Sequence, residues 1–204
     1  LHLAAMALDL GPGDKAVVPA LTFLATANAV RLTGAEVMFA DVNQETGLMG
    51  PKNLAAALSQ KGSGQVKAVF MVHYAGQCAA PDELVAVANG LPVVADSCHA
   101  LGTAYGKDGR VGDCRHAMME TFSFHPVKTI AAGEGGAVTT NDGALAERLR
   151  RLRNHGMTRE AGSFVRDDLA RDGEDRANPW YYEMTELGLN CRLSDIHCAL
   201  GLSQ

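Results

Sequence analysis

Lys128 is the residue with the clearest potential for covalent chemistry. It closes the segment 123–128 (SFHPVK), which follows an apolar run and precedes the glycine-rich stretch 133–136 (GEGG). A lysine that is desolvated at the end of a buried strand tends toward the neutral amine, which is the nucleophile that forms a Schiff base. From this segment alone, a surface lysine in a loop remains the alternative.

Asp96 is the second residue with chemical potential, because it ends the apolar run 91–95 (LPVVA). A buried carboxylate is costly unless it is paired with a cation. Enzymes that use pyridoxal phosphate pair an aspartate with the pyridinium nitrogen and a lysine with the aldehyde. The alternative is that Asp96 caps a following helix, and its position does not separate the two.

Other common catalytic patterns are missing from the sequence. Ser123 lacks the G-x-S-x-G pattern of hydrolases, and the stretch 133–136 fits neither the Walker nor the Rossmann glycine pattern. The five cysteines show no C-x-x-C spacing, so we predict no disulfide scaffold and no metal site, including at 113–116 (DCRH). This cysteine usage favours a reducing cytoplasm.

The composition narrows the class of protein. The chain has 204 residues, is 47% hydrophobic and carries a net charge of −5. These values suit a globular chain, argue against disorder and make a nucleic-acid partner unfavourable. No apolar run reaches the roughly 18 residues that a membrane span needs. The basic segment 148–153 (RLRRLR) is interpreted as a solvated helix end rather than an anion-binding patch.

Apolar runs of strand length alternate with helical patterns along the chain. Strands are predicted at 15–19, 36–40, 66–72, 92–95, 120–124 and 136–140, and helices at 1–8, 22–33, 53–58, 81–88, 142–153 and 193–202. The charged stretch 158–178 has no clear period and is predicted to be an exposed loop. The alternation predicts an α/β three-layer sandwich with a mostly parallel central sheet.

The predicted sheet indicates where a ligand would bind. In such sheets, ligands bind beyond the carboxyl ends of the strands. That rule selects the segments 19–23, 73–76, 96–99 and 123–128. Tyr74 and Gln77 are further candidates for the lining of the pocket. Lys128 and Asp96 therefore belong to the same predicted edge.

Six short motifs together resemble one protein family. They are 19–23 (PALTF), 95–100 (ADSCHA), 123–128 (SFHPVK), 133–136 (GEGG), 153–156 (RNHG) and 187–192 (LGLNCR). In this order and spacing they resemble the DegT/DnrJ/EryC1/StrS sugar aminotransferases. The resemblance runs from residue 1 to residue 204. It implies the fold type I architecture of pyridoxal phosphate enzymes and nucleotide-linked keto sugars as substrates.

The resemblance also implies roles for individual residues. Lys128 corresponds to the Schiff-base lysine that shuttles a proton, and Asp96 to the partner of the pyridinium nitrogen. His99 matches a position beside the cofactor ring, and Phe23 an aromatic residue that stacks on it. The alternatives are a hydrogen-bonded core histidine for His99 and a core aromatic for Phe23.

Two further residues are implied to contact the cofactor phosphate. Ser123 matches a phosphate ligand, and Asn190 a phosphate contact donated by the neighbouring subunit. The family pattern thus implies a homodimer with a shared active site. Residues 1–204 correspond to the large domain that binds the cofactor. The family's N-terminal phosphate-binding turn and smaller C-terminal domain are expected to lie outside this sequence.

Within the family, the sequence is most similar to the transaminase branch of the pseudaminic acid pathway. The similar segments are 96–102, 122–129 and 180–184. This branch implies UDP-4-amino-4,6-dideoxy-N-acetyl-β-L-altrosamine as product and glutamate as amino donor. Transaminases of the 4-amino-arabinose and perosamine type remain alternatives, as does a non-catalytic homologue. A family dehydratase is disfavoured because that branch lacks the lysine.

Overall fold

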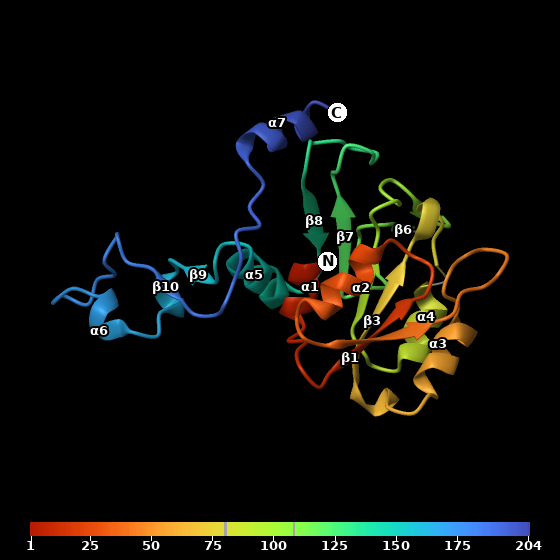
Figure 1. Ribbon diagram of the computed structural model, residues 1–204. Helices are drawn as coiled ribbons and strands as arrows, with labels where there is room; N and C mark the ends of the chain where they lie inside the picture. The colour runs from red at the N-terminus through yellow and green to blue at the C-terminus, as the bar shows by residue number, and fades with distance from the viewer. Residues whose placement is uncertain (80, 108) are drawn as a thin grey trace. The chain divides into compact units, whose positions relative to one another are not determined.

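The structure, a computed structural model, describes residues 1–79, 81–107 and 109–204. These residues form two compact units, shown in Figure 1. The first unit comprises residues 1–146 and 193–204, and the second comprises residues 147–192. The boundary lies within helix α5 (Gly143–Leu152). The assignment of residues 1–204 to a single large domain stays a prediction.

A six-stranded sheet forms the centre of the first unit, with the order β2-β1-β3-β4-β7-β8. The strands are β1 (Lys15–Pro19), β2 (Glu36–Ala40), β3 (Val66–Val72), β4 (Val93–Asp96), β7 (Met119–Ser123) and β8 (Gly136–Thr139). Every pairing is parallel except that of β7 with β8. The prediction of an α/β fold with a mostly parallel sheet is confirmed.

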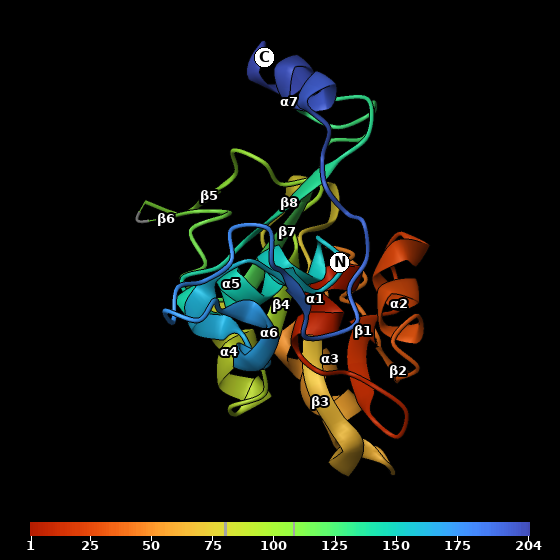
Figure 2. The ribbon, with the colours of Figure 1, turned by 90° about the vertical axis from the view of Figure 1, so that its left-hand side faces the viewer.

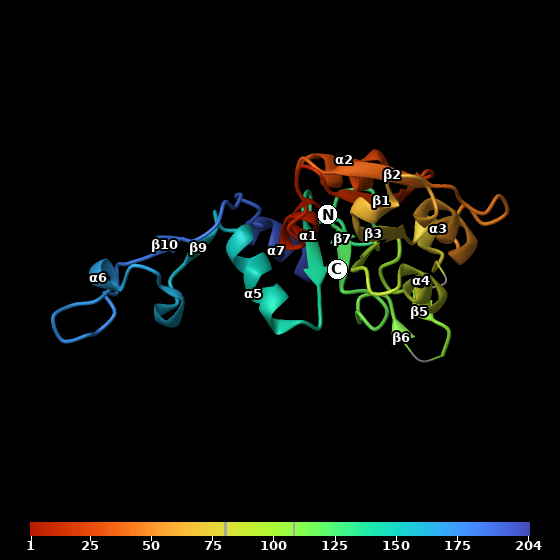
Figure 3. The ribbon, with the colours of Figure 1, turned by 90° about the horizontal axis from the view of Figure 1, so that it is seen from below.

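Helices lie on both faces of this sheet. They are α1 (His2–Ala7), α2 (Leu24–Arg31), α3 (Pro51–Leu58) and α4 (Pro81–Ala88). Val17 and Val69 pack with Leu54 of α3 and Leu84 of α4 in one buried cluster. Because strand side chains alternate between faces, the intervening residues point to the opposite side, where α1 and α2 lie (Figure 3). This arrangement gives the predicted three layers.

The β7–β8 pair is a hairpin that the sequence pattern did not specify. Its connection, residues 124–135, contains no helix, so the two strands run antiparallel (Figure 2). The backbone N–H of Phe124 donates to the oxygen of Gly135 at 2.8 Å, which continues the hairpin beyond the strands. A Cβ at Gly136 would lie 2.5 Å from the backbone oxygen of Phe122, so only glycine fits there. The hairpin thereby presents the loop that carries Lys128.

The observed helix bounds differ from the predicted ones at one functionally relevant place. Helix α2 begins at Leu24 rather than at Thr22, because Phe23 has extended backbone angles and stands at the N-cap position. Thr22 and Phe23 therefore belong to the segment between β1 and α2. Helix α7 (Asp195–Leu202) also begins later than predicted.

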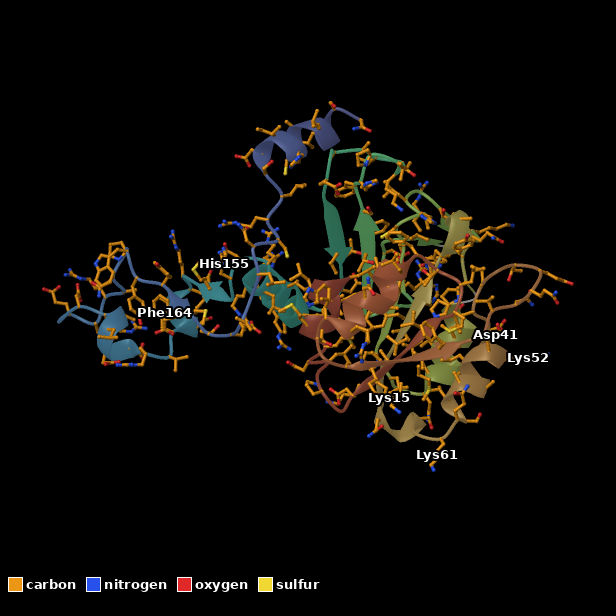
Figure 4. All side chains as sticks on the ribbon, in the orientation of Figure 1. Lys15, Asp41, Lys52, Lys61, His155 and Phe164 are labelled. Atoms are coloured by element: carbon orange, nitrogen blue, oxygen red, sulfur yellow. The ribbon has the colours of Figure 1, made fainter. Side chains whose placement is uncertain are left out.

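The second unit contains short elements only. Strands β9 (Met157–Thr158) and β10 (Glu183–Met184) pair antiparallel, and α6 (Asp167–Ala170) lies within the charged stretch. The prediction of a plain loop over 158–178 was therefore wrong for this turn of helix. The rings of Phe164, labelled in Figure 4, and Tyr181 contact each other edge to face at 5.0 Å. Such aromatic contacts stabilise the unit locally.

Two further strands, β5 (Ala104–Tyr105) and β6 (Gly109–Arg110), form a small hairpin of their own. Single turns of 3-10 helix occupy residues 63–65, 74–76 and 161–163. Within the described residues, no helix has both the length and the apolar character that a membrane crossing requires.

Glu120, the second residue of β7, is fully buried and anchors a long loop. Its carboxylate accepts hydrogen bonds from the Ser97 hydroxyl (3.1 Å) and from the Tyr105 hydroxyl (3.4 Å). It also accepts from the backbone N–H groups of Gly112 (2.8 Å) and Cys114 (3.1 Å). Four donors on one carboxylate offset the cost of burying its charge. The loop between β4 and β7 is thus tied to the sheet at its beginning, middle and end.

Glu120→Gln is expected to lower the free energy of unfolding by about 2–3 kcal/mol, because an amide nitrogen would face a backbone N–H donor. Urea unfolding of the cofactor-free protein measures this change. Glu36→Gln provides the matched control, since Glu36 is exposed on β2 and its carboxylate lies 3.9 Å from the Lys15 ammonium group. Its effect should stay within about 0.5 kcal/mol. Equal effects of the two substitutions would contradict the anchoring role.

Candidate active site

A cavity of about 860 Å³ opens in the first unit at the carboxyl ends of its strands. Its size falls in the range of roughly 300–1,000 Å³ that small-molecule sites occupy. Its lining includes residues from the segments 21–23, 72–74, 96–99, 121–128 and 134–136. The cavity lies at the edge that the sequence selects, formed by the segments after β1, β3, β4 and β7, and ligand binding there stays a prediction.

Asp96 is the last residue of β4 and lies at the cavity with only 6% of its surface exposed. Its Oδ2 atom accepts a hydrogen bond from the Thr26 hydroxyl at 2.7 Å. Its Oδ1 atom accepts from the backbone N–H of Cys98 at 3.2 Å. Each oxygen keeps a second lone pair. Asp96 is therefore a fixed carboxylate that can accept a proton or cation from the cavity.

The pKa of the Cys98 thiol is shifted by its burial and by neighbouring charges. Burial, and then the negative charge of Asp96, raise the pKa of Cys98 to about 12, while the positive charge of Lys128 opposes them. The thiol therefore stays protonated at neutral pH and is a poor nucleophile. The shift also indicates that Asp96 and Lys128 both act on this corner of the cavity.

His73, at the end of β3, also lines the cavity and is fully buried. Its Nδ1 atom accepts a hydrogen bond from the backbone N–H of Ala79 at 3.2 Å. Its Nε2 atom lies 2.8 Å from the hydroxyl of Tyr105. Burial lowers the pKa of His73 to about 4, against the opposing charge of Asp96. The neutral ring then carries its hydrogen on Nε2 and donates it to Tyr105, which donates to Glu120.

Lowering the pH is expected to destabilise the folded protein, because the buried ring of His73 resists protonation. The unfolded chain takes up a proton at this ring below about pH 6.5, whereas the folded protein does so only near pH 4. The stability contribution is therefore complete above pH 6.5 and is lost as the pH falls toward 4. The loss amounts to about 3 kcal/mol. Unfolding curves of the wild type and His73→Gln between pH 7.5 and 4 measure it, and parallel pH profiles would contradict it.

Lys128 lies in the β7–β8 loop, and its half-buried side chain lines the same cavity as Asp96. Its backbone N–H donates to the oxygen of His125 at 2.9 Å. The His125 ring and the Glu134 carboxylate, on the two sides of this loop, lie 3.7 Å apart. Lys128 is thus a loop residue at the cavity wall, and its role in Schiff-base formation stays a prediction.

Three other predicted residues line the cavity as well: Phe23, His99 and Ser123. Phe23 is 67% exposed, so its interpretation as a core aromatic was wrong, and its ring is free to stack on a ligand. His99 is exposed rather than a core histidine, and its Nδ1 atom accepts from the backbone N–H of Ala75 at 3.4 Å. Ser123 ends β7, where its hydroxyl accepts from the backbone N–H of His125 at 3.3 Å.

Asn190 belongs to the second unit and is exposed. It forms an isolated antiparallel bridge with Asn154, and its Oδ1 atom accepts from the Arg192 guanidinium at 3.1 Å. The N-cap of α7 is Ser194, whose hydroxyl accepts from the backbone N–H of His197 at 3.3 Å. Asn190 is thus free of a capping role, and its contact with a neighbouring subunit stays a prediction.

Sequence reasoning placed some pocket residues correctly and missed others. Tyr74 lines the cavity as predicted, but Gln77 does not, because its amide donates to the backbone oxygen of Thr46 at 3.2 Å. The hydrogen bond from the Thr26 hydroxyl to Asp96 was not predicted. The available signal was the i, i+4 spacing of Thr22 and Thr26, which places two hydroxyls on one side of a helix start.

The cavity contains the groups that pyridoxal phosphate needs. Asp96 offers a buried carboxylate for the ring nitrogen, Lys128 a primary amine for the aldehyde, and Phe23 an exposed ring for stacking. Ser123 offers a hydroxyl for the phosphate. Across the residues that the structure describes, no group of three or more His, Cys, Asp or Glu side chains could hold a metal ion. The fold and this lining define the class of transferases that use pyridoxal phosphate.

Comparison with known proteins identifies the family. The profile of the DegT/DnrJ/EryC1/StrS aminotransferase family matches residues 1–204. The spore coat polysaccharide biosynthesis protein SpsC of Bacillus subtilis (strain 168) is 38% identical over 208 residues, covering 100% of this chain and 49% of SpsC. The chain belongs to the DegT/DnrJ/EryC1/StrS aminotransferase family.

Solved structures agree with this assignment. The aminotransferase from Psychrobacter cryohalolentis has a TM-score of 0.84 at 31% identity, covering 99% of this chain and 48% of that one. The Spr1654 protein from Streptococcus pneumoniae, solved in its PLP form, has a TM-score of 0.79 at 27% identity, with coverages of 99% and 51%. The prediction of pyridoxal phosphate is confirmed at the level of the family. The chain spans about half the length of these relatives.

Proposed function

We propose that this chain carries the cofactor-binding and catalytic centre of a nucleotide-sugar transaminase that uses pyridoxal phosphate. The observation that carries the proposal is that Lys128 and the buried Asp96 line one cavity at the ends of β4 and β7. Family membership supports the transaminase reaction. The name of SpsC, a polysaccharide biosynthesis protein, supports a sugar substrate.

Lys128 and Asp96 have distinct tasks in this reaction. Lys128 holds the cofactor and, when its amine is free, removes and returns the proton at the substrate carbon that bears nitrogen. A positioned general base of this kind contributes roughly 10²–10⁴-fold to the rate. Asp96 keeps the ring nitrogen protonated. Pyridoxal phosphate supplies the electron sink for the electrons left by the departing proton.

The remaining predicted residues orient the cofactor. Phe23 covers one face of its ring, and His99 lies beside it. Ser123 donates to the phosphate, and Asn190 of a second copy donates from across a homodimer interface.

The five cysteines are unpaired in the structure, which supports a reducing cytoplasm as the location.

For the substrates we propose glutamate as amino donor and a UDP-linked 4-keto-6-deoxy amino sugar as acceptor, as in the pseudaminic acid pathway. The support is the similarity of the segments 96–102, 122–129 and 180–184 to that branch. The 4-amino-arabinose and perosamine types use related keto sugars and form the second candidate class.

The test is a panel of UDP- and GDP-linked 4-keto sugars, each incubated with the complete protein, pyridoxal phosphate and glutamate. Mass spectrometry should show an amino sugar and an equal amount of 2-oxoglutarate for the UDP-linked amino keto sugar. Amination of the GDP-linked sugar alone would favour the perosamine type. Loss of water without an amino product would identify a dehydratase. Absence of turnover despite a bound cofactor would identify a non-catalytic homologue.

A further inference from the structure

We propose that Thr26 is a positioning residue for Asp96, and that a chain of hydroxyls from Thr22 through Thr26 sets the orientation of that carboxylate toward the cofactor. The inference deepens the proposed function and rests on it, because it concerns the ring nitrogen that Asp96 would contact. It assigns a role to helix α2, which the transamination chemistry itself does not use.

The position of Thr26 is unusual for a polar side chain. Thr26 lies in the first turns of α2 and is fully buried, on the same side of the helix as the buried Ala29 and Val30. A hydroxyl in such a place is costly unless it is hydrogen bonded. Its partner is the Oδ2 atom of Asp96, at 2.7 Å and 70 residues away in sequence. A hydrogen bond this short to an ionised acceptor belongs to the stronger class.

The direction of the hydroxyl chain follows from the number of hydrogens. A threonine hydroxyl has one hydrogen, and Thr26 donates it to Asp96, because an ionised carboxylate only accepts. The Thr22 and Thr26 hydroxyl oxygens lie 3.2 Å apart. Thr22 must therefore be the donor in that pair. Hydrogen bonds in such a chain polarise one another, so Thr22 strengthens the bond from Thr26 to Asp96.

Two anchors from different elements hold the Asp96 carboxylate. Thr26 of α2 holds Oδ2, and the backbone N–H of Cys98, in the turn after β4, holds Oδ1 at 3.2 Å. A single anchor would leave the carboxylate free to rotate about its last bond. With both in place, the remaining lone pairs point in defined directions.

Helix α2 also links this anchor to the ring-stacking residue. Phe23 stands at the N-cap of α2, and Thr22 lines the cavity beside it. One helix start thus places the aromatic ring and fixes the carboxylate. Thr26 is buried and does not belong to the cavity lining, so it acts through Asp96.

The experiment compares cofactor affinity in the complete protein and three variants: Thr26→Val, Thr26→Ser and Thr22→Val. Two ligands are used, namely pyridoxal phosphate and its 1-deaza analogue, in which carbon replaces the ring nitrogen. Valine keeps the shape of threonine and removes the hydroxyl. Thr26→Val should weaken binding of pyridoxal phosphate roughly tenfold, the equivalent of one hydrogen bond to a charged group.

The analogue and the other variants separate positioning from structure. Binding of the 1-deaza analogue should be the same in the wild type and Thr26→Val, because the analogue has no ring nitrogen for Asp96 to hold. Thr26→Ser, which keeps the hydroxyl, should bind pyridoxal phosphate like the wild type. Thr22→Val folds around an intact Thr26 and should weaken pyridoxal phosphate binding about two- to threefold, because the polarising donor is lost.

Two results would overturn the proposal. One is unchanged affinity of Thr26→Val for pyridoxal phosphate. The other is an equal loss for both ligands in Thr26→Val and Thr22→Val, which would indicate a general structural effect. Cofactor binding requires no sugar, so this comparison remains decisive even if the panel of keto sugars shows no amination. Failure of the proposed function and failure of this inference are therefore separate outcomes.

Discussion

Lys128→Arg is expected to reduce the rate of amination by at least about 10³-fold and to abolish attachment of the cofactor by borohydride. Arginine keeps the positive charge but has no accessible neutral form, so it can neither form the bond to the aldehyde nor move the proton. Removal of a general base alone accounts for roughly 10²–10⁴-fold. Steady-state kinetics with glutamate and peptide mapping after reduction measure the two effects.

The control is Lys52→Arg, since Lys52 is exposed on α3 and labelled in Figure 4. This variant should keep the wild-type rate and should still carry the reduced cofactor at Lys128. A modified peptide that contains another lysine, or full activity of Lys128→Arg, would remove Lys128 from the proposed centre.

Asp96→Asn is expected to lower kcat by roughly 10²–10³-fold, because breaking a buried charge pair costs about 3–5 kcal/mol. Asparagine fits the same space, but its single oxygen can replace only one of the two acceptors that Thr26 and Cys98 use, because its amide nitrogen only donates. It cannot hold a proton on the ring nitrogen. The effect should fall mainly on kcat, since the nitrogen's charge matters when the proton leaves the substrate.

The same substitution has a second readout that does not depend on activity. The charge of Asp96 contributes to the raised pKa of Cys98, so Asp96→Asn should lower that pKa. Alkylation of Cys98 at fixed pH should then become faster than in the wild type. Asp41→Asn, at an exposed position labelled in Figure 4, should change neither the rate of amination nor the alkylation of Cys98. An unchanged kcat in Asp96→Asn would contradict the role of Asp96.

Much of the sheet could be predicted because its central strands are buried on both faces. Such strands read as continuous apolar runs, and β1 and β3 have the predicted bounds, as does the more exposed edge strand β2. The rule that ligands bind beyond the carboxyl ends of parallel strands then predicted Asp96 and Lys128 at one edge, without any knowledge of their contacts. The exception was β8, whose direction depends on the length and shape of a loop rather than on periodicity.

The sequence alone determined the family, the mostly parallel α/β fold and the lysine–aspartate pair, because these depend on local patterns and on their order along the chain. Only the tertiary structure decided how the carboxylates are held. Thr26 reaches Asp96 across 70 residues, and Tyr105 connects His73 to Glu120 from a hairpin that carries no sequence signal. The hydrogen bond from the Gln77 amide to the backbone oxygen of Thr46 likewise joins segments that are distant in sequence. Hydrogen bonds between distant segments depend on distances that exist only once the chain has packed.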